Sequence, residues 1–283
     1  MTDIDWTEAI RDPLAETSHP RLDGRVAIVA GGGLSGPLGG VGFALAWLLA
    51  RGGASVAVLD RDEAAAARTV DLITDAGGTA VAYALDMTDG DAVGRTVDAA
   101  AQRFGRLDLV ADSIGGGGVM GIFEASEDDW DTAFDLNLTQ VWHLIRHSQR
   151  HLTAGGAIVT ISSSAAEGRG PGLPYSVAKT ALEKLTVGAA GTLAPRGIRA
   201  NAVRVGMIWG AFAAKDMSEE LREVRRKNVA MQTEGNSWDI ASAAHFLLTD
   251  QARWITGQVL TVDGGGFAAT NRGSAGSAAT KPA

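Results

Sequence analysis

The feature that most constrains the fold of this chain is an alternation of short apolar runs with longer helical patterns. The runs that we predict to be strands lie at residues 25–30, 55–59, 80–85, 107–111, 157–161, 199–203 and 258–262. Most are apolar at consecutive positions, which is typical of strands covered on both faces. Helical patterns lie at 40–51, 62–76, 92–104, 127–152, 174–194, 218–228 and 237–250. This alternation predicts an α/β fold with a doubly wound parallel sheet, in which ligands bind at the carboxyl ends of the strands.

The two ends of the chain lack this alternation. Residues 1–21 carry prolines and scattered charges, so we expect an N-terminal extension there. Residues 268–283 are small, polar and rich in Gly and Ser, which predicts a flexible C-terminal tail. No linker or repeat interrupts residues 22–267, and we therefore expect one domain over that range.

Composition narrows the classes of function. The net charge is −8, and an acidic surface disfavours nucleic-acid binding. The absence of Cys excludes disulfides, thiolate zinc sites and Cys nucleophiles, and it suits a reducing cytoplasm. The acidic N-terminus does not resemble a secretory signal, and the longest strongly apolar run, at 41–50, is too short to cross a membrane. We therefore expect a cytoplasmic protein.

A glycine-rich loop, AGGGLSGPLGGVG at residues 30–42, joins the first predicted strand to the first predicted helix. Backbone N–H groups in such a loop, together with the helix dipole, attract phosphate groups. The loop is about five residues longer than a dinucleotide pattern needs, and a plain turn is the alternative interpretation. As cofactor-binding residues we expect Gly31, Gly36, Gly40 and Val41.

Asp60 ends the second predicted strand, about 20 residues beyond the glycines. A carboxylate at this place accepts hydrogen bonds from the ribose hydroxyls of NAD and repels the 2′-phosphate of NADP. Arg61 follows and would soften that repulsion, but we favour NAD. The alternative role for Asp60 is a helix N-cap. Asp86, beside Met87, ends the third strand and either binds adenine or forms a turn or cap before the helix that starts near Asp89.

Tyr175 and Lys179 are spaced to share one face of a helix. A free phenol titrates near pH 10, and an ammonium group about 5 Å away would lower its pKa by roughly two units. Tyr175 would then serve as an acid/base. The alternative is that two surface side chains share a helix by chance.

Two further polar features lie near this pair. Ser162, Ser163 and Ser164 follow a predicted strand, and one of their hydroxyls would hold a substrate oxygen beside the phenol. Asn137 lies in the middle of a predicted long helix, where Asn needs a reason to be. Either it binds a water that contacts Lys179, or it is a half-buried amide without a role.

The combination of these motifs resembles the short-chain dehydrogenase/reductase family, of the Tyr-x3-Lys type. The resemblance extends over residues 22–267 and includes ISSS at 161–164, YSVAK at 175–179, IRANAV at 198–203 and ITGQVLTVDGG at 255–265. It implies one Rossmann-type domain with a seven-stranded sheet. It also implies hydride transfer between a nicotinamide cofactor and a secondary alcohol or ketone.

The resemblance implies a role for each matching residue. Tyr175 is the expected acid/base, Lys179 lowers its pKa and holds the nicotinamide ribose, Ser163 polarises the carbonyl, and Asn137 completes a proton relay. Ser162 or Ser164 is the alternative to Ser163. The full set of expected cofactor-binding residues is Gly31, Gly36, Gly40, Val41, Asp60, Arg61, Asp86, Met87, Ser113, Gly115, Tyr175, Lys179 and Ile208.

The chain departs from the family pattern at four places. Its glycine loop is long, as in some enoyl reductases, but Leu182 stands where those enzymes have their Lys, so we reject that function. The family's Asn-Asn-Ala-Gly is replaced by Asp112-Ser113-Ile114-Gly115, so Asp112 must find other donors. Its Pro-Gly is replaced by Val205-Gly206, and Gly210 stands where a Thr usually bonds the carboxamide.

Residues 206–234 are expected to form a substrate lid, which in this family covers the substrate. Its apolar and aromatic residues suggest a hydrophobic or cyclic substrate, although a helical subdomain that packs on itself is the alternative. Its basic stretch at 222–228 is either a solvated face or an attraction for an anionic substrate.

His143, His147 and His151 share a helix face, but no carboxylate completes a metal set in sequence. We therefore expect no metal site, and we assign the three His to an oligomer face or a solvated stripe. Most proteins of this family are tetramers or dimers, and on this resemblance we expect a homotetramer. Two alternatives to an NAD-dependent alcohol dehydrogenase or ketoreductase remain: a cis-diol (dihydrodiol) dehydrogenase and a non-catalytic NAD(P)-sensing or scaffold protein.

Overall fold

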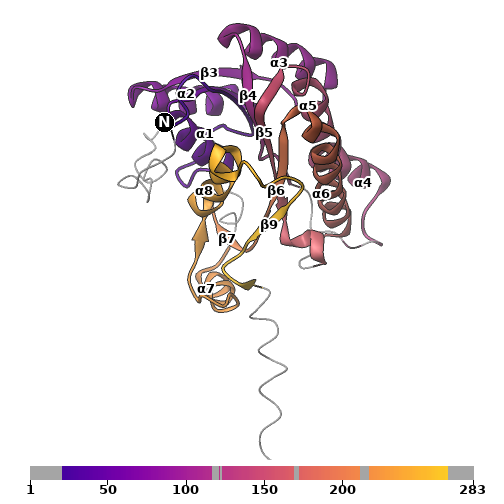
Figure 1. The fold of residues 1–283 in the computed structure, drawn as a ribbon. Helices are drawn as coiled ribbons and strands as arrows, with labels where there is room; N and C mark the ends of the chain where they lie inside the picture. Colours follow the sequence, from indigo (N-terminus) through magenta and orange to yellow (C-terminus); the bar gives the residue numbers. More distant parts are fainter. Residues whose placement is uncertain (1–20, 117–120, 122, 169–171, 211–216, 267–283) are drawn as a thin grey trace, which may run out of the picture.

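The computed structural model describes residues 21–116, 121, 123–168, 172–210 and 217–266 (Figure 1). Apart from Arg21, the expected N-terminal extension lies outside the described residues, as does the expected tail at 268–283.

A seven-stranded parallel sheet forms the centre of the protein (Figure 1). Its strand order is β3-β2-β1-β4-β5-β6-β9, which confirms the predicted doubly wound sheet. The order reverses between β1 and β4, and the crevice at such a reversal is where ligands bind in these sheets. The strands are β1 (Val26–Ala30), β2 (Ser55–Asp60), β3 (Thr79–Ala84), β4 (Leu107–Asp112), β5 (Leu152–Ser163), β6 (Arg199–Val205) and β9 (Val259–Val262).

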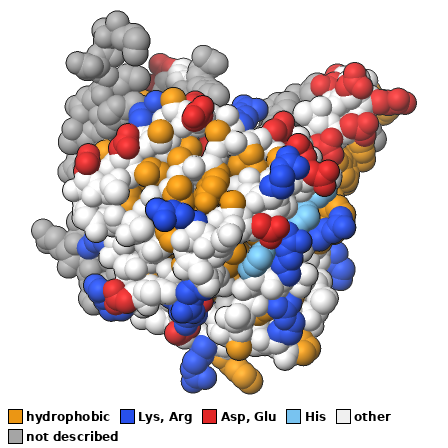
Figure 2. Space-filling model, turned by 90° about the horizontal axis from the view of Figure 1, so that it is seen from above, with side chains coloured by type: hydrophobic (Ala, Val, Ile, Leu, Met, Phe, Trp, Pro, Cys, Tyr) orange, Lys and Arg blue, Asp and Glu red, His pale blue; other side chains and the backbone are white. Residues whose placement is uncertain are grey.

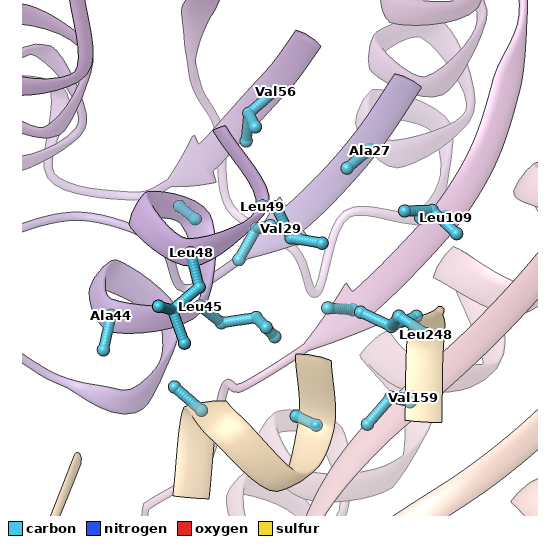
Figure 3. Packing of buried hydrophobic residues seen from close by; sticks show 14 of the residues in the cluster. Ala27, Val29, Ala44, Leu45, Leu48, Leu49, Val56, Leu109, Val159 and Leu248 are labelled. Atoms are coloured by element: carbon cyan, nitrogen blue, oxygen red, sulfur yellow. The ribbon is translucent and has the colours of Figure 1, made fainter. Parts of the chain in front are cut away.

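Helices cover both faces of the sheet (Figure 1). One face carries α1 (Val41–Arg51), α2 (Glu63–Asp75) and α8 (Ser237–Leu248), and the other carries α3 (Gly90–Phe104), α5 (Gln140–Ser148) and α6 (Leu173–Leu193). Each face has its own core of buried aliphatic side chains. In the first core, Leu45, Leu48 and Leu49 of α1 pack against Val29 of β1 and Leu248 of α8 (Figure 3).

The predicted helix at 127–152 is two helices with a π-helical segment between them. It consists of α4 (Glu127–Phe134), the π segment η1 (Asp135–Thr139) and α5. A π segment inserts an extra residue into the helical ladder and is frequently found at functional sites. The expectation of one regular helix was therefore wrong, and the irregularity surrounds Asn137.

The predicted lid contains α7 (Glu219–Lys227), as expected, and also a small two-stranded sheet that the sequence pattern did not indicate. This sheet pairs β7 (Ile208–Trp209) with β8 (Gly235–Asn236). In Figure 1 these elements lie below the main sheet, next to β9. Residues 211–216 of the expected lid lie outside the described residues. The remaining short helices are η2 (Ser164–Glu167), η3 (Ala194–Arg196) and η4 (Asp250–Ala252).

Candidate active site

The glycine loop brings the end of β1 into contact with the start of α1. A Cβ atom on Gly42 would lie 2.1 Å from the Gly31 carbonyl oxygen, so only glycine permits this contact. Gly36 and Gly40, in contrast, have nothing within 4 Å of a Cβ position. Gly40 is the N-cap of α1, and no side chain caps this helix end. Because glycine has no side chain, its place at the N-cap leaves the first N–H groups of α1, which begins at Val41, without the usual capping acceptor, as at a phosphate-binding helix start.

The extra residues of this loop are anchored to α2. Leu34 is fully buried, and its N–H donates to the Ala65 carbonyl at 3.0 Å. The Arg68 Nε donates to the Leu34 carbonyl at 2.9 Å, and the Thr69 hydroxyl donates to the Gly32 carbonyl at 2.8 Å. The long loop is therefore fixed against α2 by a buried side chain and by hydrogen bonds, which a plain turn does not need.

Asp60 lies at the carboxyl end of β2 and receives hydrogen bonds from two backbone N–H groups. Its Oδ2 accepts from Gly33 at 2.9 Å and its Oδ1 accepts from Asp62 at 3.1 Å. The N-cap of α2 is Asp62, which accepts from the Ala65 N–H, so the alternative that Asp60 is this N-cap was wrong. Arg61 follows as an exposed residue.

Asp86 forms the turn after β3. Its Oδ1 accepts from the Thr88 N–H at 2.9 Å and from the Thr88 hydroxyl at 2.8 Å. These bonds hold the pKa of the Asp86 carboxyl below its usual range. The geometry thus agrees with the turn interpretation and leaves the adenine contact a prediction. Met87 is buried beside it, and Asp89 caps α3.

Tyr175 and Lys179 lie one turn apart on α6, as their spacing predicts. The Lys179 Nζ lies 6.0 Å from the centre of the Tyr175 ring. It donates hydrogen bonds to the carbonyl oxygens of Ile114, at 3.2 Å, and Ile161, at 2.9 Å. A Cβ on Gly115 would lie 2.8 Å from this Nζ, so the chain beyond β4 passes directly over the ammonium group.

The pKa of the Tyr175 phenol is raised by burial, and a hydrogen bond with Ser163 acts in the opposite direction. The expected lowering of this pKa by Lys179 stays a prediction. The ammonium group is bound to two carbonyl oxygens, and a buried carboxylate partly offsets its charge. Burial lowers the pKa of Lys179 to about 8, and Asp112 opposes that shift.

The neighbouring hydroxyls of Ser162 and Ser163 have different partners. Ser162 donates to Glu183 Oε1 at 2.7 Å, whereas Ser163 lies within hydrogen-bonding reach of the Tyr175 phenol. Ser164 begins the helix η2. Of the three candidates, Ser163 is thus the hydroxyl beside the phenol.

Asn137 is fully buried in the π segment, next to Lys179. Its Nδ2 donates to the carbonyl oxygens of Gly116, at 2.7 Å, and Ala133, at 2.8 Å, while its Oδ1 accepts from the Gly116 N–H at 3.1 Å. The amide thus fixes the chain that follows β4. An acceptor site on Oδ1 remains for the expected water, so the relay stays a prediction.

Two of the departures from the family pattern have local explanations, whereas nothing in the structure explains Val205. The glycine that follows it is required, because a Cβ on Gly206 would lie 2.3 Å from the Asp263 Cβ. A Cβ on Gly210 would lie 2.9 Å from the Ser237 hydroxyl, which fills the space that a larger residue needs. Ser113 donates to the Ala30 carbonyl at 2.9 Å and joins β4 to β1. The Ile208 backbone, expected to contact nicotinamide, lies in β7, and its carbonyl faces Arg225 at 3.4 Å.

The basic stretch of α7 is largely paired with acids. Arg222 bonds Glu234 Oε1 at 2.9 Å and lies over the Trp209 ring at 4.0 Å, and both Arg226 and Lys227 contact Glu223. This pairing favours the solvated-face interpretation over the attraction of an anionic substrate.

The His stripe faces α3 of the same chain. A Cβ on Gly90 would lie 2.5 Å from the His143 ring, and a Cβ on Gly94 would lie 2.9 Å from the His147 ring. His151 contacts Asp98 Oδ1 at 2.6 Å. Figure 2 shows His side chains beside charged groups on this side of the molecule. His143 and His147 thus pack against α3 while staying partly exposed, so the assignment to an oligomer face or a solvated stripe stays a prediction. The part of the chain that the structure describes holds no cluster of metal-ligating side chains.

Three polar side chains around this site were not predicted from the sequence: Gln140, Arg204 and Glu183. Gln140 is fully buried and donates to Asp112 Oδ2 at 3.2 Å. Arg204 forms a two-point ion pair with Glu183, at 2.8 and 2.7 Å, next to Ser162. The sequence signal that could have identified them is that each is a polar residue on an otherwise apolar face of β6, α5 or α6.

Comparison with known proteins agrees with this geometry. A family model described as "Enoyl-(Acyl carrier protein) reductase" matches residues 36–266. The 7alpha-hydroxysteroid dehydrogenase of Escherichia coli (strain K12) is 33% identical over 254 residues, which cover 89% of this chain and 97% of that protein.

Two solved structures are also similar. A 7 alpha-hydroxysteroid dehydrogenase complexed with NADH and 7-oxo glycochenodeoxycholic acid has a TM-score of 0.82 and 33% identity, and the match covers 87% of this chain and 95% of that one. A short chain dehydrogenase from Burkholderia cenocepacia J2315 in complex with NADP has a TM-score of 0.80 and 33% identity, with 87% and 99% coverage.

Proposed function

Because this chain belongs to the short-chain dehydrogenase/reductase family, and is thus an oxidoreductase with a nicotinamide cofactor, we propose that it moves hydride between NAD(H) and a secondary alcohol or ketone. The observation that carries the proposal is the convergence of Tyr175, Lys179 and Ser163 at the carboxyl ends of the central strands. Fold alone would not carry it, because one fold hosts many functions.

The residues present fit a nicotinamide dinucleotide. Space around Gly36 and Gly40 is open, and the start of α1 offers backbone N–H groups to a pyrophosphate. When bound, the cofactor supplies or accepts the hydride. The Tyr175 phenol exchanges the proton with the substrate oxygen, and Ser163 donates a hydrogen bond to the same oxygen. Lys179, held by two carbonyls, offers its remaining proton to the nicotinamide ribose.

The preference for NAD over NADP rests on Asp60. Its carboxylate lies at the end of β2, held by the Gly33 N–H, and a Cβ on Gly33 would lie 2.6 Å from its Oδ2. A 2′-phosphate beside this carboxylate would meet like charge. The neighbouring Arg61 is the residue that would weaken the preference.

A hydrophobic or cyclic substrate is the class that suits the lid. Met207, Leu221, Val224 and Met231, all within the expected lid at 206–234, expose much of their apolar side chains. A cyclic cis-diol is a narrower case of the same chemistry.

No helix among the described residues is both long and apolar enough to cross a membrane. We further propose a homotetramer that works in the cytoplasm.

The test of this proposal is the variant Tyr175→Phe, assayed on a panel of hydrophobic secondary alcohols with NAD and of the matching ketones with NADH. We expect turnover to fall by about 10² or more, because a positioned acid/base contributes that much, while NADH still binds. A loss of less than about tenfold would remove Tyr175 from the chemistry. Cofactor binding without turnover on any substrate would favour the sensing or scaffold alternative.

A further inference from the structure

The loop that follows β1 does not return directly to α1 but first crosses the carboxyl end of β2. The Gly31 N–H donates to the Leu59 carbonyl at 2.8 Å, beside the end of that strand. The Gly33 N–H then donates to Asp60 Oδ2 at 2.9 Å, and Leu34 reaches α2. The extra residues of the loop therefore lie against the carboxylate that we expect to bind the adenosine ribose.

Leu34 is the residue that fastens this part of the loop. Its side chain is fully buried and belongs to the same core as Phe43 of α1 and Ala66 of α2. Its backbone is held as well, because its N–H donates to the Ala65 carbonyl at 3.0 Å and its carbonyl accepts from Arg68 Nε at 2.9 Å. A close-packed core tolerates little movement of such a side chain, so Leu34 fixes the position of the loop.

The anchored loop restricts the Asp60 carboxylate. A Cβ on Gly33 would lie 2.6 Å from Asp60 Oδ2 and 2.9 Å from the Ala65 Cβ, so the loop, the carboxylate and α2 are in close contact. The Asp62 N–H donates to the other oxygen, Oδ1, at 3.1 Å. Asp60 is nevertheless partly exposed, and a carboxylate oxygen can accept more than one hydrogen bond. Asp60 therefore presents a fixed pair of acceptors that has little room to turn away from a ligand.

We propose that Leu34 is a positioning residue for cofactor choice: it holds the loop against Asp60, and the fixed carboxylate then selects NAD(H) over NADP(H). The inference rests on the proposed function and deepens it, because it names what makes Asp60 selective. A carboxylate that turns freely can move aside for a 2′-phosphate, whereas a fixed one meets the phosphate with like charge. The ribose hydroxyls of NAD(H) bind well to the same carboxylate, since acceptors that are already in place lose little freedom on binding.

The decisive variant is Leu34→Ala, which removes the anchor and leaves Asp60 in place. The probes are NADH and NADPH, each titrated into the full chain and followed by fluorescence transfer from its Trp residues. We expect NADH affinity to fall about tenfold while NADPH affinity stays within about twofold, so the ratio of the two falls about tenfold. In kinetics the KM for NADH should rise with little change in kcat, because Leu34 acts on binding alone.

The matched control is Leu248→Ala, which removes a similarly buried leucine side chain from the same core, on α8. Both variants create a cavity and lower the stability of the protein. Leu248 lies outside the loop, so its loss should leave the ratio of NADH to NADPH affinity unchanged. A purely structural role for Leu34 would lower the melting temperature of both variants and change the ratio in neither.

A second variant covers the case in which Leu34→Ala does not fold. The Thr69 hydroxyl on α2 donates to the Gly32 carbonyl at 2.8 Å, and Thr69→Val removes this bond while it keeps the shape of the side chain. We expect a smaller fall in the affinity ratio, in the same direction, because one anchor of the loop is lost and the others remain.

The outcomes separate this inference from the proposed function. An unchanged affinity ratio in Leu34→Ala, or an equal fall in Leu248→Ala, overturns the inference. A parent protein that binds NADPH as tightly as NADH also overturns it, but leaves the acid/base role of Tyr175 standing. If Tyr175→Phe keeps its turnover while the ratio falls in Leu34→Ala, the proposed function fails and the inference stands. Binding of neither nucleotide by the folded parent contradicts both.

Discussion

Ser162 donates a hydrogen bond to Glu183 Oε1 at 2.7 Å, and this bond joins β5 to the helix that carries Tyr175 and Lys179. Arg204 of β6 binds the same carboxylate through two nitrogen atoms. The next hydroxyl along β5, that of Ser163, is thereby the one beside the phenol. Two consecutive serines thus divide into an anchor and a candidate for catalysis.

This division predicts different effects for two alanine variants. Ser163→Ala should lower kcat by about 10², because it removes a donor to the substrate oxygen. Ser162→Ala should cost about 1–2 kcal/mol of unfolding free energy, through the lost bond to a buried carboxylate, with little change in kcat. Steady-state kinetics and denaturant unfolding of both variants measure the two effects. The reverse assignment, with kcat lost in Ser162→Ala, would contradict the geometry.

Two glycines of the phosphate loop should also respond differently. Gly42→Ala places a methyl group against the Gly31 carbonyl and should cost about 1–3 kcal/mol of stability. Gly40→Ala meets nothing within 4 Å, and its φ of −105° suits any residue, so the fold should persist. Its methyl group would instead block the cofactor and weaken NADH binding by about tenfold, or 1.4 kcal/mol. Thermal melting and NADH titration distinguish the two; full NADH affinity in Gly40→Ala would refute the loop assignment.

Cofactor choice should depend on Asp60. The variant Asp60→Ala removes the acceptor for the ribose hydroxyls and the charge that opposes a 2′-phosphate, so the ratio of NADH to NADPH affinity should fall by about tenfold or more. Asp62→Ala is the matched control, because it removes the N-cap of α2 two residues away and should cost about 1 kcal/mol of stability instead. An unchanged ratio in Asp60→Ala would exclude this residue from cofactor selection.

The α3–α5 contact should weaken in acid. Burial, with nearby positive charges, lowers the pKa of His147 from its usual value. The folded chain then binds fewer protons at this site than the unfolded chain, so the stabilisation is complete above about pH 6.5 and is lost as pH falls below it. In His147→Gln the melting temperature should fall less steeply in acid. The difference from the parent protein should be constant near pH 8; a parallel loss of stability in acid would contradict the assignment.

The parallel sheet could be predicted because its strands are buried on both faces and so read as continuous apolar runs. The sequence correctly predicted that Tyr175 and Lys179 lie on the same face of a helix, because residues i and i+4 of a helix are one turn apart. β5 is longer than predicted, because its first part, TAGG at 153–156, is small and mostly exposed and carries no strand signal.

The details that sequence could not provide depend on contacts between distant elements. Asn137 interrupts a helix because its amide binds Gly116 across the site, which no local propensity encodes. Ser237 fills the space beside Gly210, a relation between residues on different elements. Burial raises the pKa of Tyr175 and a hydrogen bond with Ser163 opposes the rise, and neither effect can be read from the spacing of Tyr175 and Lys179.

The most direct test of the central claim is a titration of the full chain with NADH and, separately, with NADPH, followed by fluorescence transfer from its seven Trp. The account predicts saturable NADH binding that is tighter than NADPH binding and that is weakened in Gly40→Ala. Binding of neither nucleotide by the folded protein would contradict the cofactor site, and with it the proposed hydride transfer.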